Sequence, residues 1–169
     1  MVPKIVKFGP VKVAGYLHKT SMSNNTIPDF WGEIMSDGRQ KILHEQDFVE
    51  HHREYGICVM TNEDDMDYIV AVETKPGAQI PEKYMVFELA EGDYAVFNVP
   101  VYPMSEPSPN IGLTWGKAAK WLETGEYTTD GNANFELYFP DCACTNDKIC
   151  DLCNSGNMHC DIYIKVNKK

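Results

Sequence analysis

The sequence predicts an α+β fold in which one unit, made of strands, a helix and a β-hairpin, occurs twice with antiparallel pairing. The first observation is that this order of elements is found in residues 1 to about 76 and again from about 82 to 169. The second is a linker rich in proline and glycine, Lys75–Lys83, between the two halves. A length of 169 residues suits one domain built from two small fused halves, so we expect a single domain over 1–169.

Strand-like segments frame the first half. Ile5–Phe8 and Val11–Leu17 open it, and Gly56–Met60 and Tyr68–Thr74 close it as the expected hairpin. Between them, Gln40–Arg53 is polar and rich in histidine, which fits either a second helix or a loop. We expect its histidines to lie on a solvated face, since glutamates accompany them, and a metal or acid–base role is the alternative.

One helix is predicted in each half. The first runs from Pro28 to Ser36, with Thr26 as its N-cap. The second runs from Ile111 to Leu122, and Gly125 is a plausible stop. Each has one apolar face, formed by Phe30, Trp31, Ile34 and Met35 in the first helix and by Ile111, Trp115, Ala118, Ala119 and Leu122 in the second.

The second half supplies the remaining strands. Met85–Leu89 and Tyr94–Val99 precede the helix, with a turn at Glu91-Gly92-Asp93 between them. Phe135–Phe139 and Asp161–Val166 follow it and complete the second hairpin. Antiparallel pairing is expected because these connections include short turns.

Composition and charge exclude several classes of function. The formal net charge is −10, whereas non-specific binding to DNA or RNA needs a basic face. The longest uncharged stretch, Tyr94–Ser105, is too short to span a bilayer and contains two prolines. The start of the chain lacks a signal-peptide core. We therefore expect a cytoplasmic protein that does not act on membranes.

Glu136 is the most informative residue of the chain. It lies in the middle of the aromatic segment Asn134-Phe135-Glu136-Leu137-Tyr138-Phe139, where a buried carboxylate is costly without a partner. If Glu136 faces a cavity, that partner can be a ligand, and aromatic faces plus one negative charge suit a lipophilic cation. A solvent-facing position at a sheet edge is the alternative.

Several segments, in order along nearly the whole chain, resemble those of one family. They are Phe8–Tyr16, which resembles an opening strand that ends in Ala-Gly; Tyr55-Gly56-Ile57 with Tyr68–Glu73, which resembles a hairpin; Glu91–Phe97; the helix from Trp115 to Trp121-Leu122; and Phe135-Glu136-Leu137-Tyr138. The chain is similar to GyrI-like domains, the effector-binding modules of some AraC-type and MerR-type transcription activators.

The resemblance implies a fold and a site. Such domains consist of two β-α-β-β repeats related by a pseudo-twofold axis, with helices on one side and a groove between the repeats that binds lipophilic, often cationic, small molecules. Glu136 matches the buried anionic centre of the family. Tyr55 and Tyr68 match positions that line the pocket in some members. Trp115 and Trp31 are candidate walls, for which helix–sheet packing is the alternative.

Three functions are compatible with this resemblance. The first is stand-alone binding of lipophilic, cationic small molecules, which the protein would sequester or sense as xenobiotics. The second is hydrolysis of electrophilic compounds with Glu136 as general acid or base. The third is modulation of gyrase through a protein contact. No helix-turn-helix precedes the first strand, so we expect no direct contact with DNA, and a protein partner stays unknown.

A cysteine-rich insert, residues 142–160, departs from the family pattern. Cys142, Cys144, Cys150 and Cys153 form a C-x-C and a C-x-x-C pair, which together supply enough thiolates for one tetrahedral zinc ion. His159 or Cys160 could replace one of them. A structural zinc ion, rather than a cofactor required for binding, is one interpretation. A flexible thiol-rich loop is the other.

Overall fold

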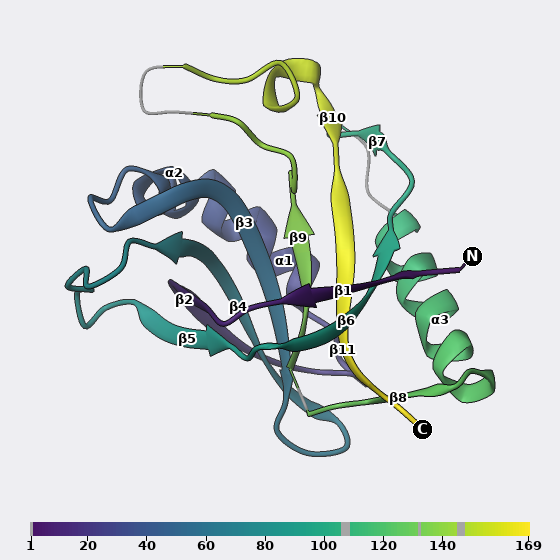
Figure 1. Cartoon of the computed structure of the whole chain (residues 1–169). Helices are drawn as coiled ribbons and strands as arrows, with labels where there is room; N and C mark the ends of the chain where they lie inside the picture. Colours follow the sequence, from purple (N-terminus) through teal and green to yellow (C-terminus); the bar gives the residue numbers. More distant parts are fainter. Residues whose placement is uncertain (1, 106–108, 132, 145–147) are drawn as a thin grey trace.

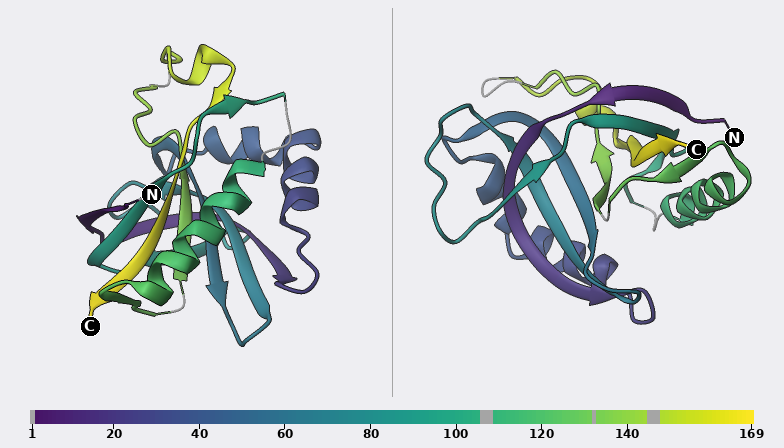
Figure 2. Two further views of the ribbon diagram at one scale, coloured as in Figure 1. Left: turned by 90° about the vertical axis from the view of Figure 1, so that its right-hand side faces the viewer. Right: turned by 60° about the horizontal axis from the view of Figure 1, so that its bottom comes forward.

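The structure, a computed structural model, describes residues 2–105, 109–131, 133–144 and 148–169. Among these residues, a curled antiparallel sheet of nine strands dominates, and helices cover its outer side (Figures 1 and 2). The strands run in the order β1-β6-β11-β9-β3-β4-β2-β5, and β8 pairs with the far end of β11. The predicted α+β class is therefore confirmed.

The elements of the first half extend the predicted ones. Their bounds are β1 Lys4–Phe8, β2 Val11–Ser21, α1 Ile27–Ser36, α2 Arg39–His44, β3 Val49–Met60 and β4 Asp65–Thr74. The segment predicted as a second helix or a loop divides between α2 and the start of β3. The β3–β4 register shifts between Val49 and Glu54, so this irregular start of β3 lacks the alternating pattern of a regular strand.

The second half adds short elements to the predicted ones. Its bounds are β5 Met85–Leu89, β6 Gly92–Asn98, β7 Tyr102–Pro103, α3 Pro109–Thr124, β8 Tyr127–Thr129, β9 Ala133–Tyr138, the 3-10 turn Cys153–Ser155, β10 Asn157–Met158 and β11 Cys160–Lys168. The strands β7, β8 and β10 were not predicted, because two or three residues carry no periodic pattern. The β7–β10 pair anchors the cysteine-rich insert beside the sheet.

The strand order is symmetric about the central pair, β3 and β9. On one side β3, β4 and β2 follow, and on the other β9, β11 and β6, so that β2-α1-β3-β4 and β6-α3-β9-β11 have the same arrangement. The outermost strands are exchanged, since β1 pairs with β6 of the second half and β5 pairs with β2 of the first. The centre of the sheet is thus the junction of the two halves.

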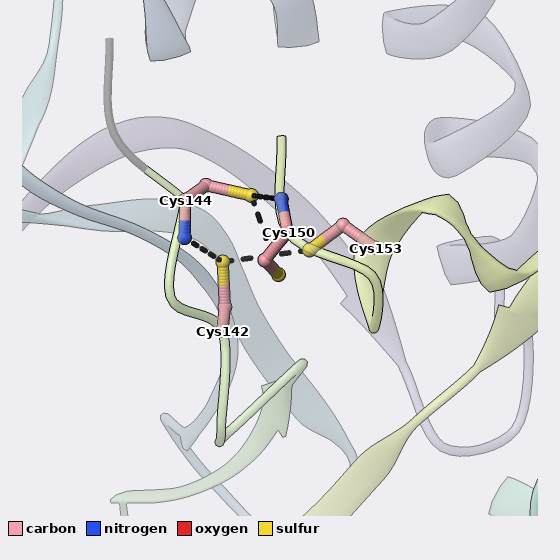
Figure 3. A group of neighbouring side chains, drawn as sticks. All are labelled: Cys142, Cys144, Cys150 and Cys153. Atoms are coloured by element: carbon pink, nitrogen blue, oxygen red, sulfur yellow. Dashed lines mark hydrogen bonds between the residues drawn. The ribbon is translucent and has the colours of Figure 1, made fainter. Parts of the chain in front are cut away.

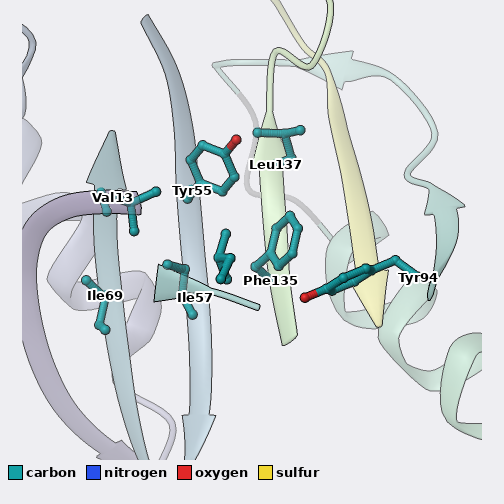
Figure 4. Packing of buried hydrophobic residues seen from close by; sticks show 9 residues of the cluster. Val13, Tyr55, Ile57, Ile69, Tyr94, Phe135 and Leu137 are labelled. Atoms are coloured by element: carbon teal, nitrogen blue, oxygen red, sulfur yellow. The ribbon is translucent and has the colours of Figure 1, made fainter. Parts of the chain in front are cut away.

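Side chains along each strand alternate between the two faces of the sheet, so the buried residues form two apolar layers. The concave side encloses the inner cluster, in which Phe135 stacks on Tyr163 with ring centroids 4.7 Å apart and also contacts Phe8 and Tyr94. Figure 4 shows this cluster between β3, β4, β9 and the neighbouring strands. The convex side packs against α1, α2 and α3.

The N-cap expected at Thr26 is found there, but its side chain has a different role. Thr26 occupies the N-cap position of α1, and its carbonyl accepts a hydrogen bond from the N–H of Phe30, but its side chain does not cap the helix. The Thr26 hydroxyl instead contacts Thr20 Oγ1 at 3.0 Å and His18 Nε2 at 2.8 Å. The side chain thereby ties the start of α1 to β2.

The inner cluster should contribute strongly to stability. Replacing Phe135, which is fully buried, with alanine should lower the free energy of unfolding by about 3–5 kcal/mol, because a large ring is lost and a cavity is left. Urea unfolding of both proteins measures the difference. Leu113→Ala, at a side chain that is 59% exposed, serves as control and should change the free energy by less than about 0.5 kcal/mol. Equal effects of the two substitutions would contradict this assignment of the core.

Candidate ligand-binding site

Glu136 lies at the centre of the convex side of the sheet. It is in the middle of β9, flanked by Gly56 of β3 and Ile162 of β11. Its side chain is only 5% exposed, so the alternative of a solvent-facing edge does not hold. Since β3 and β9 belong to different halves, the carboxylate stands at their junction.

Three aromatic side chains donate hydrogen bonds to this carboxylate. The indole N–H of Trp115, from α3, donates to Oε1 at 2.8 Å. The hydroxyl groups of Tyr138 and Tyr68 donate to Oε2 at 2.7 and 3.0 Å. All three donors are neutral, and a carboxylate with this set of bonds is buried without an unmet acceptor.

A fourth aromatic residue joins the site through Tyr68. The indole N–H of Trp31, from α1, donates to the Tyr68 hydroxyl at 2.9 Å. The Trp31 ring also meets the ring of Tyr138 edge to face, with centroids 5.3 Å apart. One tryptophan from the helix of each half therefore reaches the centre of the sheet. We call Glu136, Trp31, Tyr68, Trp115 and Tyr138 the carboxylate cluster.

Gly56 makes room for this cluster. It faces Glu136 across the β3–β9 ladder, and a Cβ atom there would overlap the Tyr68 hydroxyl and lie 2.9 Å from Glu136 Oε2. Any side chain at this position would displace the hydrogen-bond partners of the carboxylate. The glycine of the Tyr55-Gly56-Ile57 segment is thus required by the site.

Burial governs the electrostatics of the cluster. Loss of hydration raises the pKa of Glu136, and the hydrogen bonds from Trp115, Tyr138 and Tyr68 oppose that rise without cancelling it. Burial and then the Glu136 charge raise the pKa of the Tyr68 and Tyr138 hydroxyl groups, which keeps both as neutral donors. The Cys58 thiol, whose pKa is raised by the same two causes, also feels this charge.

The structure brings together most of the residues that the sequence suggested. Tyr68 and Trp115 bond to Glu136, and Trp31 joins them through Tyr68. Tyr55 is not part of this group. Tyr55 lies in the inner cluster on the opposite side of the sheet, where its hydroxyl donates to Glu73. Tyr55 directly precedes Gly56 in β3, and the side chains of neighbouring residues in a strand face opposite sides of the sheet, so Tyr55 points away from Glu136.

Tyr138 is the member of the cluster that the sequence analysis did not single out. It lies two residues after Glu136 in the same strand, and residues i and i+2 of a strand share a face. That spacing was the available signal. Its hydroxyl makes the shortest of the hydrogen bonds to the carboxylate.

A second buried carboxylate lies beside the cluster. Glu54 is 8% exposed and faces Tyr138 across the β3–β9 ladder. Gln40 donates to its Oε2 at 3.0 Å, and His44 Nε2 lies 3.0 Å from Oε1. The histidine-rich segment is therefore partly buried against the sheet at His44, and the expectation of a wholly solvated face was wrong there.

The four cysteines of the insert gather at one point away from the carboxylate cluster (Figure 3). The sulfur atoms of Cys142, Cys144, Cys150 and Cys153 all lie within 4.8 Å of one another. Cys160 does not join them, because its thiol is buried in the apolar layer beneath α3. This arrangement could hold a metal ion.

Because Gly56 leaves space for two side chains, Gly56→Ala should disturb the site. We expect a loss of about 1–3 kcal/mol in the free energy of unfolding, since the added methyl group overpacks the contact with the Tyr68 hydroxyl. Chemical denaturation measures it. Gly112→Ala in α3, where an added Cβ meets nothing within 4 Å, is the matched control and should be neutral or stabilise by up to about 1 kcal/mol. A neutral Gly56→Ala would argue against a tightly filled site.

The raised pKa of Glu136 predicts a pH dependence of stability. In the folded chain the carboxyl group holds its proton to a higher pH than its ordinary pKa of 4.5, so the folded state binds more protons. Relative to Glu136→Gln, the wild type should therefore lose stability as the pH rises from 4.5 through the raised pKa, and level off above it. Urea unfolding of both proteins over this range tests the sign. If the wild type instead gained stability relative to Glu136→Gln as the pH rises, the hydrogen bonds to the carboxylate would outweigh its burial.

Among the described residues, none of the helices has the length and apolar character needed to cross a membrane.

The fold has close counterparts among solved structures. A putative transcription regulation protein of Staphylococcus aureus matches with a TM-score of 0.71 and 16% identity, over 99% of both chains. The protein SAV2435, solved bound to tetraphenylphosphonium, matches with a TM-score of 0.69 and 17% identity over 99% of this chain and 94% of that one.

An integron cassette protein of Vibrio cholerae matches with a TM-score of 0.64 and 13% identity, over 98% of this chain and 96% of that chain. These likenesses confirm the predicted GyrI-like fold. No curated protein matches the sequence. The family model for Cass2, the integron-associated effector binding protein, matches residues 4–166, and the chain therefore belongs to this family of effector-binding proteins.

Proposed function

We propose that this protein binds lipophilic organic cations at the carboxylate cluster, in order to sequester or sense them as xenobiotics. The observation that carries the proposal is the buried carboxylate of Glu136, bonded only to neutral aromatic donors among its described hydrogen-bond partners. Membership of an effector-binding family supports a small-molecule ligand, and the tetraphenylphosphonium complex of SAV2435 supports this chemical class.

A lipophilic cation would supply the positive charge that the carboxylate cluster lacks. Neutral N–H and O–H donors satisfy the geometry of the carboxylate but leave its charge without a countercharge, and burial makes that charge costly. A cation beside Glu136 would supply the countercharge. Contacts with aromatic faces add about 0.5–2 kcal/mol each, so two or three of them together with the ion pair are compatible with micromolar affinity.

The two tryptophans are the proposed walls of the pocket. In this structure their indoles lie against Tyr68, Tyr138 and Glu136 and fill the space beside the carboxylate. Both are half-buried and belong to helices on the outside of the sheet. A ligand would enter as these rings turn aside, exchanging indole N–H bonds for a cation and an aromatic surface.

The geometry favours binding over the alternative of hydrolysis. A general base must reach the proton that it removes, directly or through one water molecule. Both oxygen atoms of Glu136 already accept hydrogen bonds from aromatic side chains, and little of the carboxylate meets solvent. No cofactor enters the proposal, because the chain itself supplies the charge and the rings.

A titration with tetraphenylphosphonium and a neutral analogue, triphenylphosphine oxide, tests the proposal. Glu136→Gln keeps the shape of the side chain and removes its charge, so it should weaken binding of the cation about 10- to 100-fold, which is about 1.4–2.8 kcal/mol. Binding of the neutral compound should change less than about twofold. Isothermal titration calorimetry measures both.

Glu88→Gln, at an exposed carboxylate on the edge strand β5, is the control for the change in net charge and should leave both affinities as they are. Equal losses for the cation and the neutral compound in Glu136→Gln would show a packing effect and reject a charge-reading pocket. Failure of the wild type to bind the cation at all would reject the proposed ligand class.

A further inference from the structure

The cysteine-rich insert has little to hold its shape. It connects β9 to β11, and the described apolar side chains in it include Ile149, which is 65% exposed. Its regular structure among the described residues is one 3-10 turn, an isolated bridge residue at Lys148 and the two-residue strand β10. Met158 and Cys160, at its end, pack into the apolar layer beneath α3, but none of the described residues from 142 to 155 belongs to an apolar cluster. That part of the insert needs another source of order, such as a metal ion or a covalent link.

The sulfur atoms of the insert have the spacing of a tetrahedral metal site. For zinc–sulfur bonds of about 2.3 Å, neighbouring sulfurs of a tetrahedron lie about 3.8 Å apart. Cys144 and Cys150 have their sulfurs 3.6 Å apart, those of Cys142 and Cys153 are 3.4 Å apart, and all four lie within 4.8 Å of one another. The two pairs therefore surround one point (Figure 3).

Backbone amides add a second sign of a thiolate site. The N–H of Cys144 points to the sulfur of Cys142 at 3.4 Å, and the N–H of Cys150 points to the sulfur of Cys144 at 3.2 Å. Such donors stabilise negative charge on sulfur, and the atoms that coordinate a metal must be deprotonated. The chain is thus folded around sulfur atoms as acceptors.

We propose that Cys142, Cys144, Cys150 and Cys153 bind one Zn²⁺ ion in a closed tetrathiolate site that holds the insert in its fold. Binding replaces the four S–H bonds with four Zn–S bonds and releases four protons, without any change of oxidation state. The four sulfurs fill the tetrahedron and leave no position for water or substrate, so the site is structural. It is independent of the proposed ligand pocket.

Two disulfide bonds explain the arrangement less well. A disulfide brings two sulfurs to about 2.05 Å and places no requirement on a second pair. Here the Cys144–Cys150 pair and the Cys142–Cys153 pair converge on the same point. His159 and Cys160 do not compete as ligands, since the His159 ring lies against Phe139 and the Cys160 thiol is buried under α3.

Metal analysis of the full-length chain, purified without chelators or affinity metals, tests the site. Inductively coupled plasma mass spectrometry should find about one zinc ion per chain. Modification of the thiols with an organomercurial should release that zinc, as followed with a chromogenic chelator. Replacement by Co²⁺ should give the visible absorption bands of a tetrahedral thiolate complex.

Cys150→Ser should reduce the bound zinc to a small fraction of the wild-type content and lower the melting temperature. Cys58→Ser is the matched control, because Cys58 lies in β3 outside the insert, and it should retain the full zinc content. If Cys150→Ser fails to fold, zinc content and thiol release in the wild type still decide the question.

Three results would overturn the proposal. One is wild-type protein without zinc after zinc is supplied. Another is a mass that is lower by four hydrogen atoms, which would establish two disulfides. The third is bound iron with visible absorption, which would assign the four thiolates to another metal. Loss of cation binding in Glu136→Gln has no bearing on any of these outcomes.

Discussion

The burial of one carboxylate shapes the centre of this protein. A negative charge removed from water costs several kcal/mol unless hydrogen bonds replace its hydration. Glu136 receives three such bonds, from Trp115, Tyr138 and Tyr68. These donors come from α3, β9 and β4, so the position of the carboxylate depends on elements of both halves at once. Because their contacts converge on one side chain, the two halves are coupled there.

One strand serves both the core and the site. In β9, Phe135 and Leu137 face the inner cluster, whereas Glu136 and Tyr138 face the helices. A shift of the register by one residue would move the carboxylate into the apolar core and the aromatic ring out of it. The fully buried Phe135 ring, stacked on Tyr163, therefore fixes the register that presents Glu136 to α1 and α3.

More of the carboxylate cluster could be predicted from the sequence than of the side-chain packing around it. A lone carboxylate in an aromatic strand is a local signal, and it led to Glu136 directly. Tyr68 and the tryptophans followed from resemblance and helical spacing. Tyr55 was assigned with them, although it neighbours Gly56 in sequence and so faces the other side of the sheet. Tyr138 was passed over, although it lies two residues after Glu136 and so faces the same side. Both depend on which face of β3 and β9 meets the helices.

Other features depend on long-range pairing and had no local signal. The exchange of β1 and β5 between the halves cannot be inferred from either strand alone. The partial burial of His44 follows from its contact with Glu54, which lies on a different element. In contrast, the gathering of Cys142, Cys144, Cys150 and Cys153 could be predicted from their spacing alone, since short separations in sequence bring side chains close in space.

The symmetry of the strand order makes the difference between Gly56 and Glu136 meaningful. These residues face each other in the central β3–β9 pair, the pair about which the two halves are arranged. Two glutamates in these positions would bring like charges into contact in a buried site, and one of them would have to stay protonated. Glycine avoids that repulsion and leaves the volume that the Tyr68 hydroxyl and Glu136 Oε2 occupy. Glycine opposite Glu136 therefore leaves the junction of the two similar halves with a single carboxylate and with the room that its hydrogen-bond partner Tyr68 needs.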